Sequence, residues 1–139
     1  MKLGTAIALV AKGFEFILDK QGKPYFLHCH FVAENVQSED EKVVAYLHDV
    51  VEDGIYTMKE LINLGLTESQ QELLLLLTHK KEDSYEKYIE KISTNQLATN
   101  IKKADLKHNS DISRLKDVTK KDLDNLIKYH KAYKYLSKL

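Results

Sequence analysis

The sequence Ser38-Glu-Asp-Glu-Lys-Val-Val-Ala-Tyr-Leu-His-Asp-Val-Val-Glu-Asp-Gly54 combines the pattern of an amphipathic helix with a compact group of polar side chains. Ser38 and the glutamate three residues later match a capping box, in which each side chain accepts a hydrogen bond from the other residue's backbone N–H. Apolar residues follow at helical spacing at Val43, Val44 and Leu47. Because the Asp-Gly pair at 53–54 is a usual helix end, we predict a helix over residues 38–53.

The same signals recur along the chain. Capping boxes begin at Thr57 and Thr67, and Gly65 is placed to end the first of these two helices. Glycine and proline are scarce, and the segments between them show helical rather than alternating periodicity. We expect one compact all-α helical bundle that forms a single domain over residues 1–139. Further helices are expected over residues 3–18, from Pro24 onward, and over 84–93, 95–110 and 119–138, the last completing the core with Leu123, Leu126, Ile127, Tyr133 and Leu136.

Composition narrows the classes of partner. The chain has 139 residues, and its 21 basic and 21 acidic side chains give a formal net charge of zero. A neutral balance argues against nucleic acid as a partner, because such binders usually carry a clustered basic excess. The longest apolar run, Leu73 to Leu77, is far below the ~18 residues of a membrane span, so we expect no membrane segment. The single cysteine, Cys29, excludes an internal disulfide, and the default location is the reducing cytoplasm.

The polar group at the end of the 38–53 helix predicts a metal site. On a helix, Glu52 would stack over His48 and Asp53 over Asp49, which places three carboxylates and one imidazole together. Burying such a group without a cation is costly, and a divalent metal would relieve the repulsion. His48 and Asp49 need further ligands from other helices, and the candidates that we single out are His28 and Asp105. A shell of two imidazoles and two carboxylates suits Mn²⁺, Fe²⁺ or Zn²⁺ better than Ca²⁺.

Three motifs carry a resemblance to a known family, and together they are specific. They are Pro24-Tyr-x-x-His28, His48-Asp-x-Val-Glu-Asp53 and Ala104-Asp-x-x-x-Asn109. In this order and spacing they resemble the HD superfamily of metal-dependent phosphohydrolases, most closely the hydrolase domain of the RelA/SpoT alarmone enzymes and the small alarmone hydrolases. The resemblance runs from about Ala6 to Arg114. It implies a bundle of the HD-domain type and a metal, typically Mn²⁺, held by His28, His48, Asp49 and Asp105.

The resemblance also implies an activity. Glu52 and Asp53 match the acidic pair that this family uses to activate or orient the attacking water, and Asn109 matches a residue that contacts the nucleotide sugar. The implied reaction removes the 3′-pyrophosphate of guanosine tetra- or pentaphosphate, a small-molecule substrate. Because that substrate is strongly anionic, lysines near the site are expected to help bind it, and the candidates are Lys20, Lys23, Lys102 and Lys107.

The chain departs from the family where the base should be recognised. The family usually has His-x-Gly-Gln followed by Arg-Lys just before a Gly-x-Pro-Tyr turn, which corresponds to residues 22–25 here. Counted back from Pro24, the histidine position falls at about Phe14, and the single arginine of the chain is Arg114. Lys20 and Lys23 cannot stack on a base as a guanidinium does, so we expect weak discrimination between guanine and adenine. Hydrolysis of another phosphorylated nucleotide, or a non-catalytic nucleotide-binding module with a structural metal, remain alternatives. His108 is either a partner of the site or an ordinary packed or surface histidine.

Overall fold

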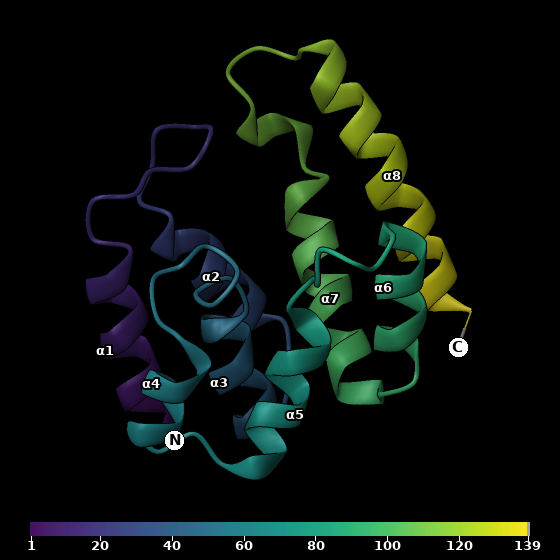
Figure 1. Cartoon of the computed structure of the whole chain (residues 1–139). Helices are drawn as coiled ribbons and strands as arrows, with labels where there is room; N and C mark the ends of the chain where they lie inside the picture. Colours follow the sequence, from purple (N-terminus) through teal and green to yellow (C-terminus); the bar gives the residue numbers. More distant parts are fainter. Residues whose placement is uncertain (139) are drawn as a thin grey trace.

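The fold is all-α, as the periodicity predicts. The computed structural model describes residues 1–138, within which the only extended pairing is an isolated bridge between Leu18 and Pro24. Figure 1 shows the helices gathered into one compact bundle. In chain order they are α1 (Leu3–Gly13), α2 (Phe26–Glu34), α3 (Glu39–Leu47), α4 (Met58–Asn63), α5 (Glu68–Leu77), α6 (Tyr85–Ser93), α7 (Gln96–Asn109), the short 3₁₀ helix η1 (Ile112–Arg114) and α8 (Lys120–Ser137).

The predicted capping boxes are confirmed at their helix starts. The side chains of Ser38, Thr57 and Thr67 each accept a hydrogen bond from the backbone N–H three residues later, and the reciprocal bond is present in each case. Thr119 caps α8 in the same way. Gly65 follows α4 with a φ of 105°, a conformation that favours glycine. These local bonds satisfy backbone groups that a helix end would otherwise leave without partners.

The centre of the bundle is α7, which packs against α2, α3, α5, α6 and α8. On another side α3 contacts α1, α2 and α5, so that α3 and α7 together bring all of these helices around one core. Fully buried side chains of the core include Leu47, Leu74, Ile101 and Leu106. In Figure 1, α8 runs along α6 and α7, and its first turns extend beyond the other helices together with η1.

The first helix is shorter than expected, because the prediction of 3–18 is wrong beyond Gly13. Residues 17–25 fold back on themselves: the N–H of Tyr25 donates to the carbonyl of Ile17, and that of Asp19 donates to Lys23. Gly22 supplies the turn with a φ of 82°. This 17–25 turn begins where the predicted helix would still continue, and it lies toward α7 and α8.

The third helix also ends early, at Leu47 instead of Asp53. The His48 Nδ1–H donates to the Ala45 carbonyl at 2.6 Å, and this is the carbonyl that a continuing helix would offer to the N–H of Asp49. Residues 48–53 therefore follow as a series of turns. His48 and Asp49 lie at the exit of α3, where the chain changes direction.

The inward face predicted for α8 is only partly correct. Leu136 is buried, whereas Leu123 is 50% exposed and Ile127 is 56% exposed. These two residues belong to the part of α8 nearer its start, which extends beyond the neighbouring helices (Figure 1). Within residues 1–138, no helix has the length and apolar character needed to cross a membrane.

Two isoleucine truncations test this assignment of the core. Ile101→Ala should lower the free energy of unfolding by about 2–5 kcal/mol, because it opens a cavity at a fully buried position of the central helix. Ile127→Ala is the matched control and should cost less than about 1 kcal/mol, since its side chain is mostly exposed. Urea denaturation followed by circular dichroism measures both values. Equal losses would show that Ile127 is buried in solution.

Candidate metal centre

Four side chains from three separate parts of the chain meet in the interior. His28 comes from α2, His48 and Asp49 from the exit of α3, and Asp105 from α7. One nitrogen or carboxylate oxygen of each lies within 4.8 Å of those of the other three. His28, His48 and Asp105 are buried, and Asp49 is partly exposed. The cluster could hold a metal ion, and it unites the four residues that the sequence singled out as ligands.

The histidines present the same atom to the centre of the cluster. His28 Nε2 lies 3.0 Å from Asp105 Oδ1 and 3.8 Å from Asp49 Oδ2. His48 Nε2 lies 3.0 Å from Asp49 Oδ2 and 3.3 Å from Asp105 Oδ1. Since His48 Nδ1–H is donated to the Ala45 carbonyl, Nε2 is the ring nitrogen that would offer its lone pair to a metal. This is the arrangement of a metal-binding histidine held by a backbone carbonyl.

Each carboxylate is held in turn by a neighbouring side chain. Lys102 Nζ lies 2.7 Å from Asp105 Oδ2, and the Asn109 amide donates to Asp105 Oδ1 at 3.0 Å. The Tyr25 hydroxyl donates to Asp49 Oδ2 at 2.5 Å. Such partners fix the orientation of ligand side chains and raise their affinity for metal. The donor set and its supports therefore fit a divalent ion.

Without a metal, the carboxylates draw positive charge into the cluster. Burial alone would lower the pKa of His48, but the carboxylates of Asp49 and Asp105 raise it well above its ordinary value. Burial would raise the pKa of Asp105, yet Lys102 and His48 hold it well below its ordinary range. A metal ion bound here would take the place of the His48 proton, since metal binding to histidine requires the neutral ring.

Two further residues support the site: Tyr25, whose role the sequence did not predict, and His108, for which the sequence left two alternatives open. Tyr25 was noted only as part of a motif, and its position three residues before His28 on the α2 side of the turn is the signal that places it near the ligands. His108 has its Nδ1 2.8 Å from His28 Nδ1, and its ring lies between those of His28 and Phe31. Burial, with the charges of Arg114 and His28, lowers the pKa of His108 to about 4, so its neutral ring can accept the His28 Nδ1–H. His108 is thus a partner of the site, through His28.

The predicted acidic pair lies next to the centre but is not stacked on a helix. Glu52 Oε1 accepts a hydrogen bond of 2.7 Å from the backbone N–H of His79, in the loop between α5 and α6. Desolvation, with the carboxylates of Asp49 and Glu52, raises the pKa of Asp53 to about 6. The prediction that Glu52 stacks over His48 and Asp53 over Asp49 on one helix is wrong, because α3 ends at Leu47. The pair instead belongs to the turns that follow.

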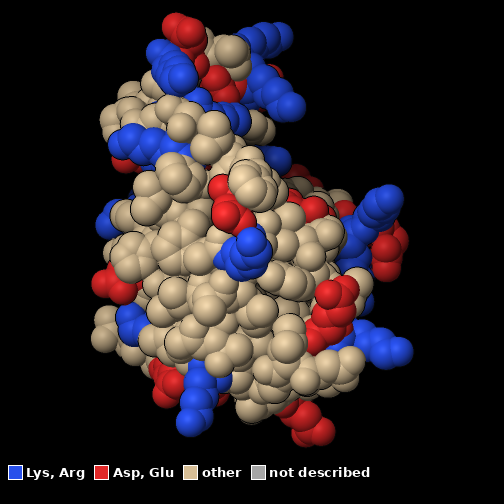
Figure 2. Space-filling model, turned by 90° about the vertical axis from the view of Figure 1, so that its left-hand side faces the viewer, with Lys and Arg blue, Asp and Glu red and all other residues tan. Residues whose placement is uncertain are grey.

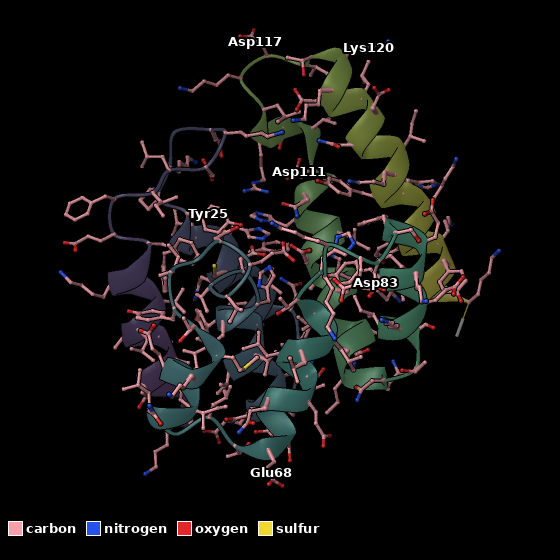
Figure 3. All side chains as sticks on the ribbon, in the orientation of Figure 1. Tyr25, Glu68, Asp83, Asp111, Asp117 and Lys120 are labelled. Carbon is pink, nitrogen blue, oxygen red and sulfur yellow. The ribbon has the colours of Figure 1, made fainter. Side chains whose placement is uncertain are left out.

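A cleft of about 380 Å³ adjoins the cluster, and His28 forms part of its wall. It lies between the 17–25 turn on one side and the end of α7, η1 and α8 on the other. Tyr25 and Asp111, both labelled in Figure 3, line it from these two sides. Lys20 and Asn109 line it as well. A volume of this size accommodates a small organic ligand.

The other lysines expected near the substrate lie elsewhere. Lys23 lines a separate, shallower hollow next to His108, and Lys107 lies on another face between the α2–α3 loop, α3, α7 and α8. Lys102 is partly buried and forms an ion pair with Asp105, so it supports a proposed metal ligand, and it does not line the cleft. Arg114, the single arginine of the chain, lines the cleft and donates to the carbonyl of His108.

Comparison with known proteins adds no family to this description. No protein-family model matches the chain, and no curated protein matches it. The functional assignment therefore depends on the residues of the chain itself.

Metal binding is the first property to test. We expect the protein to bind one Mn²⁺ per chain and His48→Ala to weaken that binding about 100-fold or more, because one of four ligands is lost. Isothermal titration calorimetry gives the affinities, and far-UV circular dichroism checks that the helices remain. His130→Ala on the exposed side of α8 is the control and should bind as the wild type does. Equal binding by His48→Ala would remove His48 from the ligands.

Asp53 should make stability depend on pH in the metal-free protein. Its pKa is about 6 in the folded chain and about 4 in an unfolded one, so its ionised form destabilises the fold. This destabilisation by ionised Asp53 is absent below pH 4 and complete above pH 6. In the presence of chelator, Asp53→Asn should therefore raise the melting temperature by about 3 °C at pH 8 and leave it unchanged at pH 4. The expected gain is small because solvent screens this exposed carboxylate. A gain of the same size at both pH values would contradict the shift.

Proposed function

We propose that the chain is a metal-dependent phosphohydrolase that acts on a phosphorylated nucleotide. The observation that carries this proposal is the opening of the four-residue cluster onto a cleft of about 380 Å³, with His28 belonging to both. A ligand in this cleft would have one end against the metal ligands. The resemblance to the alarmone hydrolases supports guanosine tetraphosphate as the first substrate to test, with release of its 3′-pyrophosphate.

The residues around the centre supply the parts that such a hydrolysis needs. A divalent ion held by the cluster would polarise a phosphoryl oxygen and lower the pKa of bound water. Glu52, which is held by the His79 N–H, can orient or deprotonate the attacking water, and Asp53 can assist at the leaving 3′-oxygen. The water oxygen forms a bond to phosphorus, the bond between phosphorus and the ribose 3′-oxygen breaks, and that oxygen takes up a proton. The products are pyrophosphate and a free 3′-hydroxyl.

A non-catalytic nucleotide-binding module is the second candidate. A purely structural metal site has no need of carboxylates beyond its ligands, and Glu52 and Asp53 provide two. This speaks for catalysis. The two candidates separate in one assay, in which the purified protein is incubated with Mn²⁺ and a panel of phosphorylated nucleotides and pyrophosphate or phosphate release is measured. Metal and nucleotide binding without release from any member of the panel would favour the module.

Glu52→Gln tests the mechanism at a single group. If Glu52 handles or orients the attacking water, turnover should fall about 100-fold or more while Mn²⁺ stays bound, because the amide keeps the size of the side chain but cannot take a proton. Steady-state kinetics and calorimetry measure the two properties. Glu68→Gln makes the same change at the far end of the molecule (Figure 3) and should keep the wild-type rate. A wild-type rate in Glu52→Gln would exclude Glu52 from the reaction.

A further inference from the structure

The cleft beside the proposed metal centre has an unusual distribution of charge. Its walls include two cations, Lys20 and Arg114, and three carboxylates, Asp19, Asp111 and Asp122. Leaving His28 aside, the charged walls therefore sum to −1. Much of the remaining surface is apolar or aromatic and comes from Ile17, Leu18, Leu115, Tyr25 and Tyr129.

Both cations are already paired across the cleft. Lys20 Nζ lies 2.9 Å from Asp122 Oδ1, which joins the 17–25 turn to the first turn of α8. Arg114 lies 3.4 Å from Asp19 Oδ2, which joins η1 to the same turn. Hydrogen bonds from Thr119 and the nearby Lys20 lower the pKa of Asp122 to about 2, so this carboxylate is ionised throughout the neutral range. Within residues 1–138, the cations that line the cleft thus have carboxylate partners.

This pairing limits how much negative charge a ligand can bring. A phosphate group at the metal end would be balanced by the bound ion. A second phosphorylated group in the rest of the cleft would have to displace a carboxylate from Lys20 or Arg114 and then lie beside it, and juxtaposed like charges weaken binding strongly. Figure 2 shows side chains of both signs mixed at the end of the molecule that carries η1 and the start of α8, in keeping with this balance.

We propose that the cleft selects nucleotides whose phosphates are all at the ribose position held by the metal centre, with an uncharged nucleoside in the remainder of the cleft. Asp122 and Asp19 are the residues that determine this specificity, because they neutralise the cations that a second phosphate group would need. The inference rests on the proposed function and narrows its substrate class. It predicts that guanosine tetraphosphate, which the resemblance makes the first substrate to test, is a poorer substrate than a nucleotide phosphorylated at the 3′ position alone.

The direct test compares two substrates that differ only at the 5′ position. Guanosine 3′-diphosphate has a 5′-hydroxyl, whereas guanosine 3′,5′-bis(diphosphate) carries the second charged group. With Mn²⁺, we expect kcat/KM to be about tenfold or more higher for the 5′-hydroxyl substrate. An equal or higher value for the bis(diphosphate) would overturn the proposal while leaving the phosphohydrolase function intact.

Two variants of the Lys20–Asp122 pair should change the ratio of these kcat/KM values in opposite directions. Asp122→Asn keeps an oxygen that can accept the Thr119 hydrogen bonds of the α8 cap, but it removes a negative charge and releases Lys20. It should shift the ratio toward the bis(diphosphate) by about fivefold. Lys20→Ala leaves Asp122 unpaired and should shift the ratio the other way. Asp124→Asn, on the same helix but outside the cleft, is the control and should change the ratio less than about twofold.

A binding measurement separates this proposal from the catalytic one. The Glu52→Gln protein loaded with Mn²⁺ is titrated with guanosine 3′-monophosphate and with guanosine 3′,5′-bisphosphate. Tighter binding of the monophosphate supports the inference even if the wild type hydrolyses neither substrate, in which case the proposed function alone fails. Tighter binding of the bisphosphate, or ratios that do not respond to Asp122→Asn, would overturn the inference.

Discussion

Asp105 is the group around which the interior of this protein is organised. Its Oδ1 faces the Nε2 atoms of both His28 and His48, and its Oδ2 faces the Lys102 ammonium. A buried carboxylate is tolerated only where such partners surround it. Since the partners come from α2, from the exit of α3 and from α7 itself, the same electrostatic requirement fixes how these three elements pack.

The position of α7 makes this requirement effective. It contacts five other helices, and Ile101 and Leu106 on either side of Asp105 are fully buried in the core. Apolar packing therefore holds Asp105 in place along the helix, while the polar residues Lys102 and Asn109, three before and four after it, reach back to its carboxylate. The core and the candidate site share one helix, so that mutations in the core next to Asp105 are expected to move the site.

The sequence predicted what depends on local patterns and missed what depends on the meeting of distant segments. The capping boxes identified where their helices begin, because Ser38 or Thr67 interacts with a residue three positions away. At the early end of α3 the His48 side chain bonds to the Ala45 carbonyl, a contact that hydrophobic periodicity does not predict. The proposed ligands could be named from motifs. In contrast, the position of Lys102 outside the cleft and the approach of Arg114 to Asp19, 95 residues earlier, follow only from the packing of α7 and η1.

The four proposed ligands are synthesised before the residues of α8 that line the cleft. All four proposed ligands occur by Asp105, whereas Asp122, Asn125 and Tyr129 of the cleft belong to α8. A nascent chain leaves the ribosome with its N-terminal part first, so the ligand cluster is synthesised before the wall that faces the 17–25 turn. An ion that binds the cluster would therefore take none of its four ligands from α8, whereas an organic molecule in the cleft would need α8 as part of its wall.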